Sequence, residues 1–267
     1  GDTGPSGIWE NDGNGDFTYS GDDIIPMTPT GGWDGSGNYG STFTDYDLDG
    51  DLDLYITHCR QGVSSSTDER RINQLFENDG NGNYAEDFTN TNQLRIGAQS
   101  WTTDFQDMDN DGDFDAFMTH HDVNNMLLRN DNGVFNDIYD GSGLDMSVGT
   151  PIQGLMRDFD NDMYVDILVT GSDNTTTYAL YMNNGDNTFT RVDGVFGSSG
   201  LYSPAIGDLN HDGFIDVYAS YGTIYTNPSS TPDGLWINDG NDNNWLAVDL
   251  EGTISNRSAI GAVVRMY

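Results

Sequence analysis

The chain has 267 residues, a formal net charge of −35 and 39 aspartates against five glutamates, and its nine basic residues are all arginines. Such an acidic surface repels nucleic acids and anionic lipids, and no run of 18 apolar residues is present, so we expect no nucleic-acid partner and no membrane insertion. The excess of Asp over Glu, together with 34 glycines, is typical of turns between strands rather than of helices.

The first predicted element is a partial hairpin at residues 8–20. An apolar strand end at Ile8 and Trp9 is followed by an Asn/Asp/Gly turn, and the aromatic Phe17 begins the return strand. The same order of residues recurs at 75–84, 127–135, 180–189 and 235–245. Asn, Asp and Gly tolerate positive φ, so we interpret these turns as tight β-hairpins in preference to additional metal sites.

Four acidic loops alternate with these hairpins, at spacings of 62, 51 and 50 residues between their first positions. Each loop carries oxygen-bearing side chains at positions 1, 3, 5 and 9, and three of the four have glycine at position 6. At position 7 the main-chain carbonyl is the expected ligand. The predicted metal ligands are Asp45, Asp47, Asp49, Asp51 and Asp53; Asp107, Asp109, Asp111, Asp113 and Asp115; Asp158, Asp160, Asp162, Tyr164 and Asp166; and Asp208, Asn210, Asp212, Phe214 and Asp216.

Oxygen ligands at every second residue around one tight turn suit Ca²⁺, which takes six to eight of them. Packed carboxylates repel one another unless a cation neutralises them. Position 12 is apolar in every loop, so no EF-hand glutamate is present. The sequence therefore predicts about four Ca²⁺ ions, one in each loop that joins two strands.

The loops and hairpins combine into a repeated unit of four strands. Each loop leads into an apolar run too short for a helix, then into a variable loop and an Asn-Gly hairpin, which defines blades at about 41–90, 98–138, 150–196 and 202–250. Repeated antiparallel units of this size predict an all-β fold, a β-propeller of four-stranded blades with Ca²⁺-binding hairpin loops. Residues 244–250 and 260–266 could complete the partial hairpin as a fifth blade, or both ends belong to blades that continue outside this chain.

Candidate catalytic groups are sparse. His58 and His120 both lie five residues after the ninth-position Asp of their loops, which places them at equivalent points of two strands. We interpret them as packing residues, and no nucleophile, phosphate-loop or dinucleotide motif accompanies them. Trp33 and Trp101 are candidates for stacking on sugar rings, although packing between blades is the favoured interpretation.

The Asp-x-Asp-x-Asp-Gly-x-x-Asp loops, each followed by an aliphatic strand and an Asn-x-Gly-x-Phe-like turn, resemble FG-GAP/VCBS repeats, the blades of integrin-α-like propellers. The resemblance covers about 41–250, and residues 244–267 resemble the start of an ASPIC/UnbV domain of the cartilage-acidic-protein-like type. It implies a calcium-stabilised extracellular propeller used in adhesion or recognition. Met163 replaces the glycine of the third loop, so an altered turn and a lower metal affinity are expected there, and Asn210 at position 3 of the fourth loop is a neutral ligand.

We therefore expect a non-enzymatic, calcium-binding propeller that recognises an extracellular protein or a glycan. Weak calcium sites fill in millimolar calcium, which favours a secreted or cell-surface location. Two alternatives stay open at this point. The chain could be a structural subunit that self-associates through blade edges, or the propeller of a secreted polysaccharide-active enzyme.

Overall fold

A computed structural model of the chain describes residues 8–19, 37–60, 62–87, 93–145, 148–172, 178–197, 201–223, 227–228, 230–253, 262 and 264. The described residues form strands and one three-residue 3-10 helix, η2 (Glu69–Arg71), with no α-helix. None of the helical structure in these ranges is long or apolar enough to span a membrane. The all-β prediction is confirmed.

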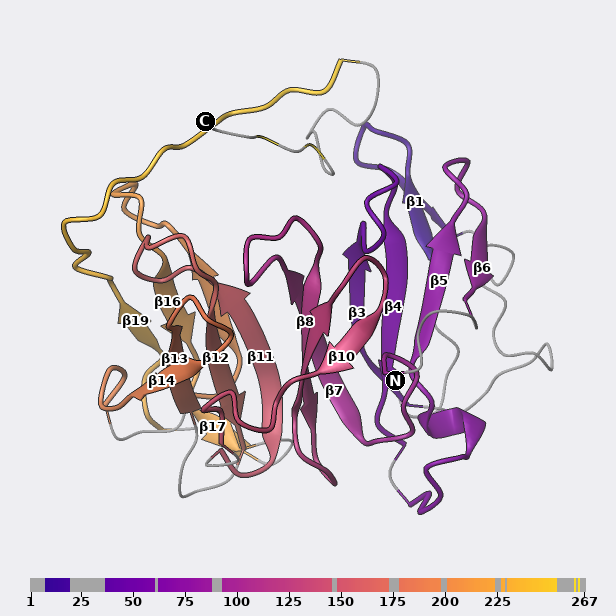
Figure 1. Cartoon of the computed structure of the whole chain (residues 1–267), viewed down its shortest axis with the longest axis horizontal. Helices are drawn as coiled ribbons and strands as arrows, with labels where there is room; N and C mark the ends of the chain where they lie inside the picture. Colours follow the sequence, from indigo (N-terminus) through magenta and orange to yellow (C-terminus); the bar gives the residue numbers. More distant parts are fainter. Residues whose placement is uncertain are drawn as a thin grey trace.

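Three antiparallel sheets have four strands each, joined in chain order, and they stand side by side in Figure 1. The first sheet contains β3 (Asn38–Thr44), β4 (Asp53–His58), β5 (Gln74–Asn78) and β6 (Tyr84–Glu86). The second contains β7 (Ser100–Gln106), β8 (Asp115–His120), β9 (Met126–Asn130) and β10 (Phe135–Asp137). The third contains β11 (Pro151–Arg157), β12 (Asp166–Gly171), β13 (Tyr178–Asn183) and β14 (Phe189–Val192). These are the first three predicted blades.

The second strand of each sheet forms the centre of the core. All six residues of β4, β8 and β12 are buried, because each of these strands is paired on both edges and covered by a neighbouring sheet. A strand buried on both faces gains from continuous apolar residues, which explains why these runs do not alternate with polar residues. Apolar side chains of these central strands pack against one another between the sheets. Phe117 of β8 and Ile167 of β12, for example, belong to one cluster between the second and third sheets.

Buried threonines connect one sheet to the next near the ends of these strands. The Gly40 N–H donates to Thr57 Oγ1 (2.8 Å), and the same hydroxyl donates to the Trp101 carbonyl of the second sheet (2.8 Å). Thr119 makes the corresponding contact with the Ile152 carbonyl of the third sheet (3.3 Å). Because Gly40 lies against Thr57 and the Trp101 carbonyl, a Cβ at that position would be 2.7 Å from both. The first strands β3, β7 and β11 therefore pack closely against one another.

The fourth sheet differs from the predicted four-stranded blade at 202–250. Its three strands are β15 (Pro204–Gly207), β16 (Asp216–Ala219) and β19 (Gly234–Trp236), with a separate pair of β17 (Gly222–Thr223) and β18 (Asn227–Pro228). The fourth strand is missing because residues 237–253 run as an extended segment without strand pairing. In Figure 1 this segment leaves β19 and crosses above the sheets.

The two ends are only partly described. The predicted hairpin at 8–20 is present as β1 (Trp9–Asn11) paired with β2 (Phe17–Tyr19), and Ile8 packs against the first sheet. Residues 20–36, including Trp33, lie outside the described residues, as do most of 254–267. Closure into a ring and the ASPIC/UnbV resemblance thus stay predictions.

Candidate metal centres

The acidic loops lie where the first strand of each sheet turns into the second. In three of them the carboxylates of positions 1, 3 and 9 converge, with one oxygen from each within 4.8 Å of the others. The three groups are Asp45, Asp47 and Asp53; Asp107, Asp109 and Asp115; and Asp158, Asp160 and Asp166. Three carboxylate oxygens this close together form a site for a hard cation.

Backbone amides shape each loop around its first aspartate. In the second loop, the N–H groups of Asp111 and Gly112 donate to the two oxygens of Asp107, at 3.1 and 3.0 Å. In the third loop the N–H groups of Asp162 and Met163 donate to Asp158 in the same way, at 3.2 and 2.9 Å. These hydrogen bonds fold each loop around its first aspartate, so the side chains at positions 3 and 9 lie close to the side chain at position 1.

The ninth aspartate joins each loop to the second hairpin of its own sheet. Asp115 Oδ2 accepts the Met108 N–H and Oδ1 accepts the Asn130 N–H, both at 2.8 Å. Asn130 in turn donates to the Phe114 carbonyl (3.2 Å) and accepts the turn amide of Gly133 (2.7 Å). The same asparagine links recur at Asn78, Asn183 and Asn238. A single buried carboxylate thus fixes both the metal loop and the Asn-Gly turn.

The electrostatics of the groups are unfavourable without a cation. Burial raises the pKa of Asp53, Asp115 and Asp166 to about 7, despite the amide hydrogen bonds that lower it. Burial and the charge of Asp111 also raise the pKa of Asp109. A bound divalent cation reverses this balance, because it favours the charged form of each carboxylate.

The structure does not bring every predicted ligand into these groups. The fifth-position carboxylates lie outside the three convergent groups and accept the position-7 amide instead, for example Asp113 N–H to Asp111 Oδ1 at 3.0 Å. The corresponding acceptors in the other loops are Asp49, Asp162 and Asp212. Their role as ligands stays a prediction.

The side chains at position 7 point to the neighbouring Asn-Gly turn. Asp113 Oδ2 accepts the Asn132 N–H at 2.6 Å. The Tyr164 ring lies against Gly185, where a Cβ would be 2.8 Å away, and the Phe214 ring lies against Gly240 at 2.7 Å. Metal ligation through the main-chain carbonyl of position 7 also stays a prediction, at Asp51, Asp113, Tyr164 and Phe214.

The fourth loop has the same backbone design with one carboxylate fewer. The N–H groups of Asp212 and Gly213 donate to Asp208 (both 3.0 Å), and Asp216 accepts the Leu209 and Asn238 amides (both 2.9 Å). Asn210 is neutral and donates to Asp212 (2.7 Å). The fourth loop therefore lacks the third-position carboxylate that the three convergent groups contain.

A left-handed residue at position 4 connects successive loops. Asn110 (φ 62°) donates to the Met163 carbonyl of the third loop (2.8 Å), and Asn161 (φ 58°) donates to the Gly213 carbonyl of the fourth (3.0 Å). Met163 itself has a φ of 76°, so the third loop keeps the turn that glycine forms elsewhere. The predicted alteration of this turn is therefore wrong, because the surrounding hydrogen bonds impose the conformation on methionine.

Sequence reasoning missed the links made by the repeated asparagines and by position 4. The signal was present, since an asparagine opens every Asn-Gly turn, but its partners are distant in sequence. His58 and His120 do occupy equivalent buried strand ends, and their amides donate to Asn73 (2.9 Å) and Asn125 (3.1 Å). Trp101 is buried too, and its indole N–H donates to His121 Nδ1 (2.8 Å), so it is not an open sugar platform.

Comparison with known proteins supports the repeat and the fold. An FG-GAP-like repeat model matches residues 158–219, which include the third loop and extend to β16. No curated protein matches the chain. A solved structure of an Agrocybe aegerita lectin, described as recognising non-reducing terminal N-acetylglucosamine, is similar with a TM-score of 0.50 and 16% identity. The alignment covers 87% of this chain and 60% of the lectin chain, so our chain spans less than two thirds of that protein. At this identity the likeness concerns the fold, and the chain carries an FG-GAP-like repeat within an all-β fold shared with a lectin.

Proposed function

We propose that the chain is a non-enzymatic, calcium-binding recognition module that acts outside the cell. The observation that carries the proposal is the convergence of three aspartates in each of three successive loops. The described donors in these groups are carboxylate oxygens, without histidine or cysteine, which favours a hard cation over zinc. Calcium suits flexible loops with several oxygens better than magnesium, which demands a strict octahedron.

Calcium would act as a structural brace in this module. Each ninth aspartate holds the loop and the second hairpin together through buried hydrogen bonds, so a cation on that aspartate stabilises four strands at once. An ion that binds the folded chain alone increases its stability by mass action. Millimolar calcium outside cells would keep such sites filled, which supports a secreted or cell-surface location.

A glycan is the ligand class that we place first, with an extracellular protein second. The shared fold with a lectin supports a carbohydrate ligand, and the strongly negative charge disfavours acidic polymers. The test is a glycan array probed with the folded protein in millimolar calcium, beside a chelated sample. Binding to a defined sugar class that disappears in chelator is expected. A blank array from a calcium-loaded, folded protein would refute the glycan assignment.

Self-association is a second candidate, because one observation favours it. The β1–β2 hairpin exposes 61% of Trp9 and 60% of Phe17, and within the described part of the chain its two strands pair with no strand besides each other. Exposed apolar edges promote pairing between chains. Light scattering over a range of protein concentrations tests this role: a mass that rises with concentration supports an assembly subunit, and a constant monomer mass refutes it.

A further inference from the structure

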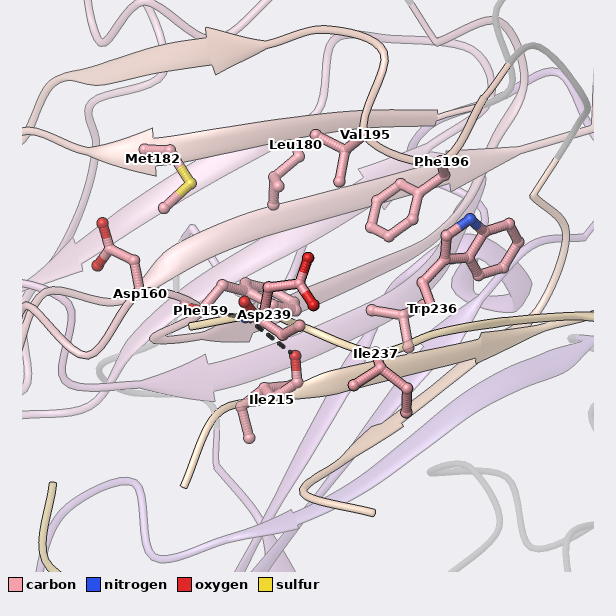
Figure 2. Close-up of a pocket in the computed structure, with 12 residues that line it drawn as sticks. Phe159, Asp160, Leu180, Met182, Val195, Phe196, Ile215, Trp236, Ile237 and Asp239 are labelled. Carbon is pink, nitrogen blue, oxygen red and sulfur yellow. Dashed lines mark hydrogen bonds between the residues drawn. The ribbon is translucent and has the colours of Figure 1, made fainter. Parts of the chain in front are cut away.

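A cavity of about 300 Å³ lies between the third and fourth sheets. Phe159, Leu180 and Phe196 line it from the third sheet and its loops, and Trp236 and Ile237 from the fourth (Figure 2). The cavity continues the packed core between these sheets, since Phe159, Leu180 and Phe196 belong to both. Trp236 of β19 lines the cavity, and the outer edge of β19 lacks a strand partner among the described residues.

The two preceding junctions fill the corresponding place with an aromatic side chain. Phe189, the first residue of β14, packs with Met108 and Leu127 between the second and third sheets. Phe135, the first residue of β10, packs with Tyr46 and Leu75 between the first and second.

Phe159 occupies the same position in its repeat as Met108 and Tyr46 do in theirs, the second residue of the acidic loop. Leu180 likewise corresponds to Leu127 and Leu75. The cavity is therefore the place where the fourth repeat lacks its aromatic residue.

Trp245 is the aromatic residue of the fourth repeat. Asn130 pairs with Phe135 and Asn183 pairs with Phe189, so the repeat places Trp245 opposite Asn238. Instead, the Trp245 ring lies on Gly213 of the fourth loop and is 49% exposed. The glycines at position 6 of the first two loops have no such neighbour within 4 Å.

We propose that residues 244–250 dock on the edge of β19 as the missing fourth strand, with the Trp245 side chain in the cavity. The seven-residue step from Asn238 to Trp245 is one residue longer than the step from Asn183 to Phe189, which a hairpin loop accommodates. Docking covers an open sheet edge and removes a large aromatic side chain from water. The chain thus has two positions for this segment, one across the fourth loop and one in the fourth sheet.

A cysteine pair tests the docked register directly. Pairing Asn238 with Trp245 places Leu235 opposite Val248, and both side chains are exposed in the structure. Facing residues of antiparallel strands are close enough for a disulfide. We expect Leu235→Cys/Val248→Cys to form an intramolecular disulfide under mild oxidation at least ~10-fold faster than the out-of-register pair Leu235→Cys/Leu250→Cys. The single-cysteine variants control for pairing with the buried Cys59.

The outcomes of this experiment are distinct. A monomer with the expected disulfide supports the proposal. A disulfide-linked dimer overturns the proposal, because the segment of a second copy would then occupy the cavity. Equally slow oxidation of both cysteine pairs also overturns it. Thermal melting gives an independent readout: Trp245→Ala should lower the melting temperature by several degrees more than Val248→Ala, because Val248 in this register lies opposite Leu235, which is not among the residues that line the cavity. Equal melting temperatures would overturn the proposal.

Discussion

The threonine links between sheets lead to a matched pair of substitutions. Thr57→Val removes the hydroxyl that accepts the Gly40 N–H and donates to the Trp101 carbonyl, both at 2.8 Å, while it preserves the shape of the side chain. Thr170 has the equivalent place on β12 and is equally buried, but among the described residues its Oγ1 has no hydrogen-bond partner. The two substitutions therefore differ in the hydrogen bonds that they remove.

The expected difference follows from the cost of leaving buried polar groups unpaired. Thr57→Val leaves the Gly40 N–H and the Trp101 carbonyl unpaired, and each unsatisfied group costs about 1–3 kcal/mol, so the free energy of unfolding should fall by about 2–6 kcal/mol. Thr170→Val loses no bond and replaces an unpaired buried hydroxyl with a methyl group, so it should raise the free energy of unfolding, by up to about 3 kcal/mol. Urea denaturation followed by tryptophan fluorescence, in excess calcium, measures both values. Equal losses for the two variants would contradict the view that these threonines hold neighbouring sheets together.

Three further predictions concern single positions. Met163 has a left-handed backbone conformation and is 74% exposed, so Met163→Gly should stabilise the protein by about 0.5–1 kcal/mol, whereas Met163→Ala should not. Thermal melting in calcium measures both effects. Equal effects of the two substitutions would show that the backbone at Met163 is not strained. Gly185 and Gly82 both have positive φ, but a Cβ at Gly185 would clash with the Tyr164 ring. Gly185→Ala should therefore lower the free energy of unfolding by about 1–2 kcal/mol more than Gly82→Ala, as measured from denaturation midpoints. Burial lowers the pKa of His120 to about 4, below the ordinary 6.5, so its contribution to stability is complete above pH 6.5 and is lost as the pH falls toward 4. His120→Leu should therefore lose about 2–3 kcal/mol less than the wild type between pH 7 and pH 4.5, and parallel losses would contradict a neutral buried imidazole.

Much of the fold could be predicted because the relevant signals are local. The alternation of acidic loop, apolar run and Asn-Gly turn determines strand order and hairpin pairing within about 50 residues, and the first three sheets follow it. The fourth sheet could not be predicted in this way, because β19 and the segment beyond it have the same local pattern but do not pair. Competition between two positions of Trp245 depends on tertiary contacts that spacing does not reveal.

The candidate sites were predictable to a similar extent. Positions 1, 3 and 9 converge as the spacing indicates, since a tight turn brings these side chains to one point. The link from Asp115 to Asn130 was not predicted, because each residue already had a role in its own segment. Asp115 was interpreted as a metal ligand, and Asn130 as a turn residue. The contact from Asn110 to Met163 crosses between sheets and depends on how the sheets stack.

Isothermal titration of the calcium-free protein with CaCl₂ measures whether the acidic loops bind calcium and how many ions each chain takes up. The structure predicts at least three ions per chain, and Asp109→Ala should reduce the number by one while the other loops keep theirs. A folded protein that binds no calcium at millimolar concentration, or an unchanged ion count in Asp109→Ala, would show that these loops are not calcium sites.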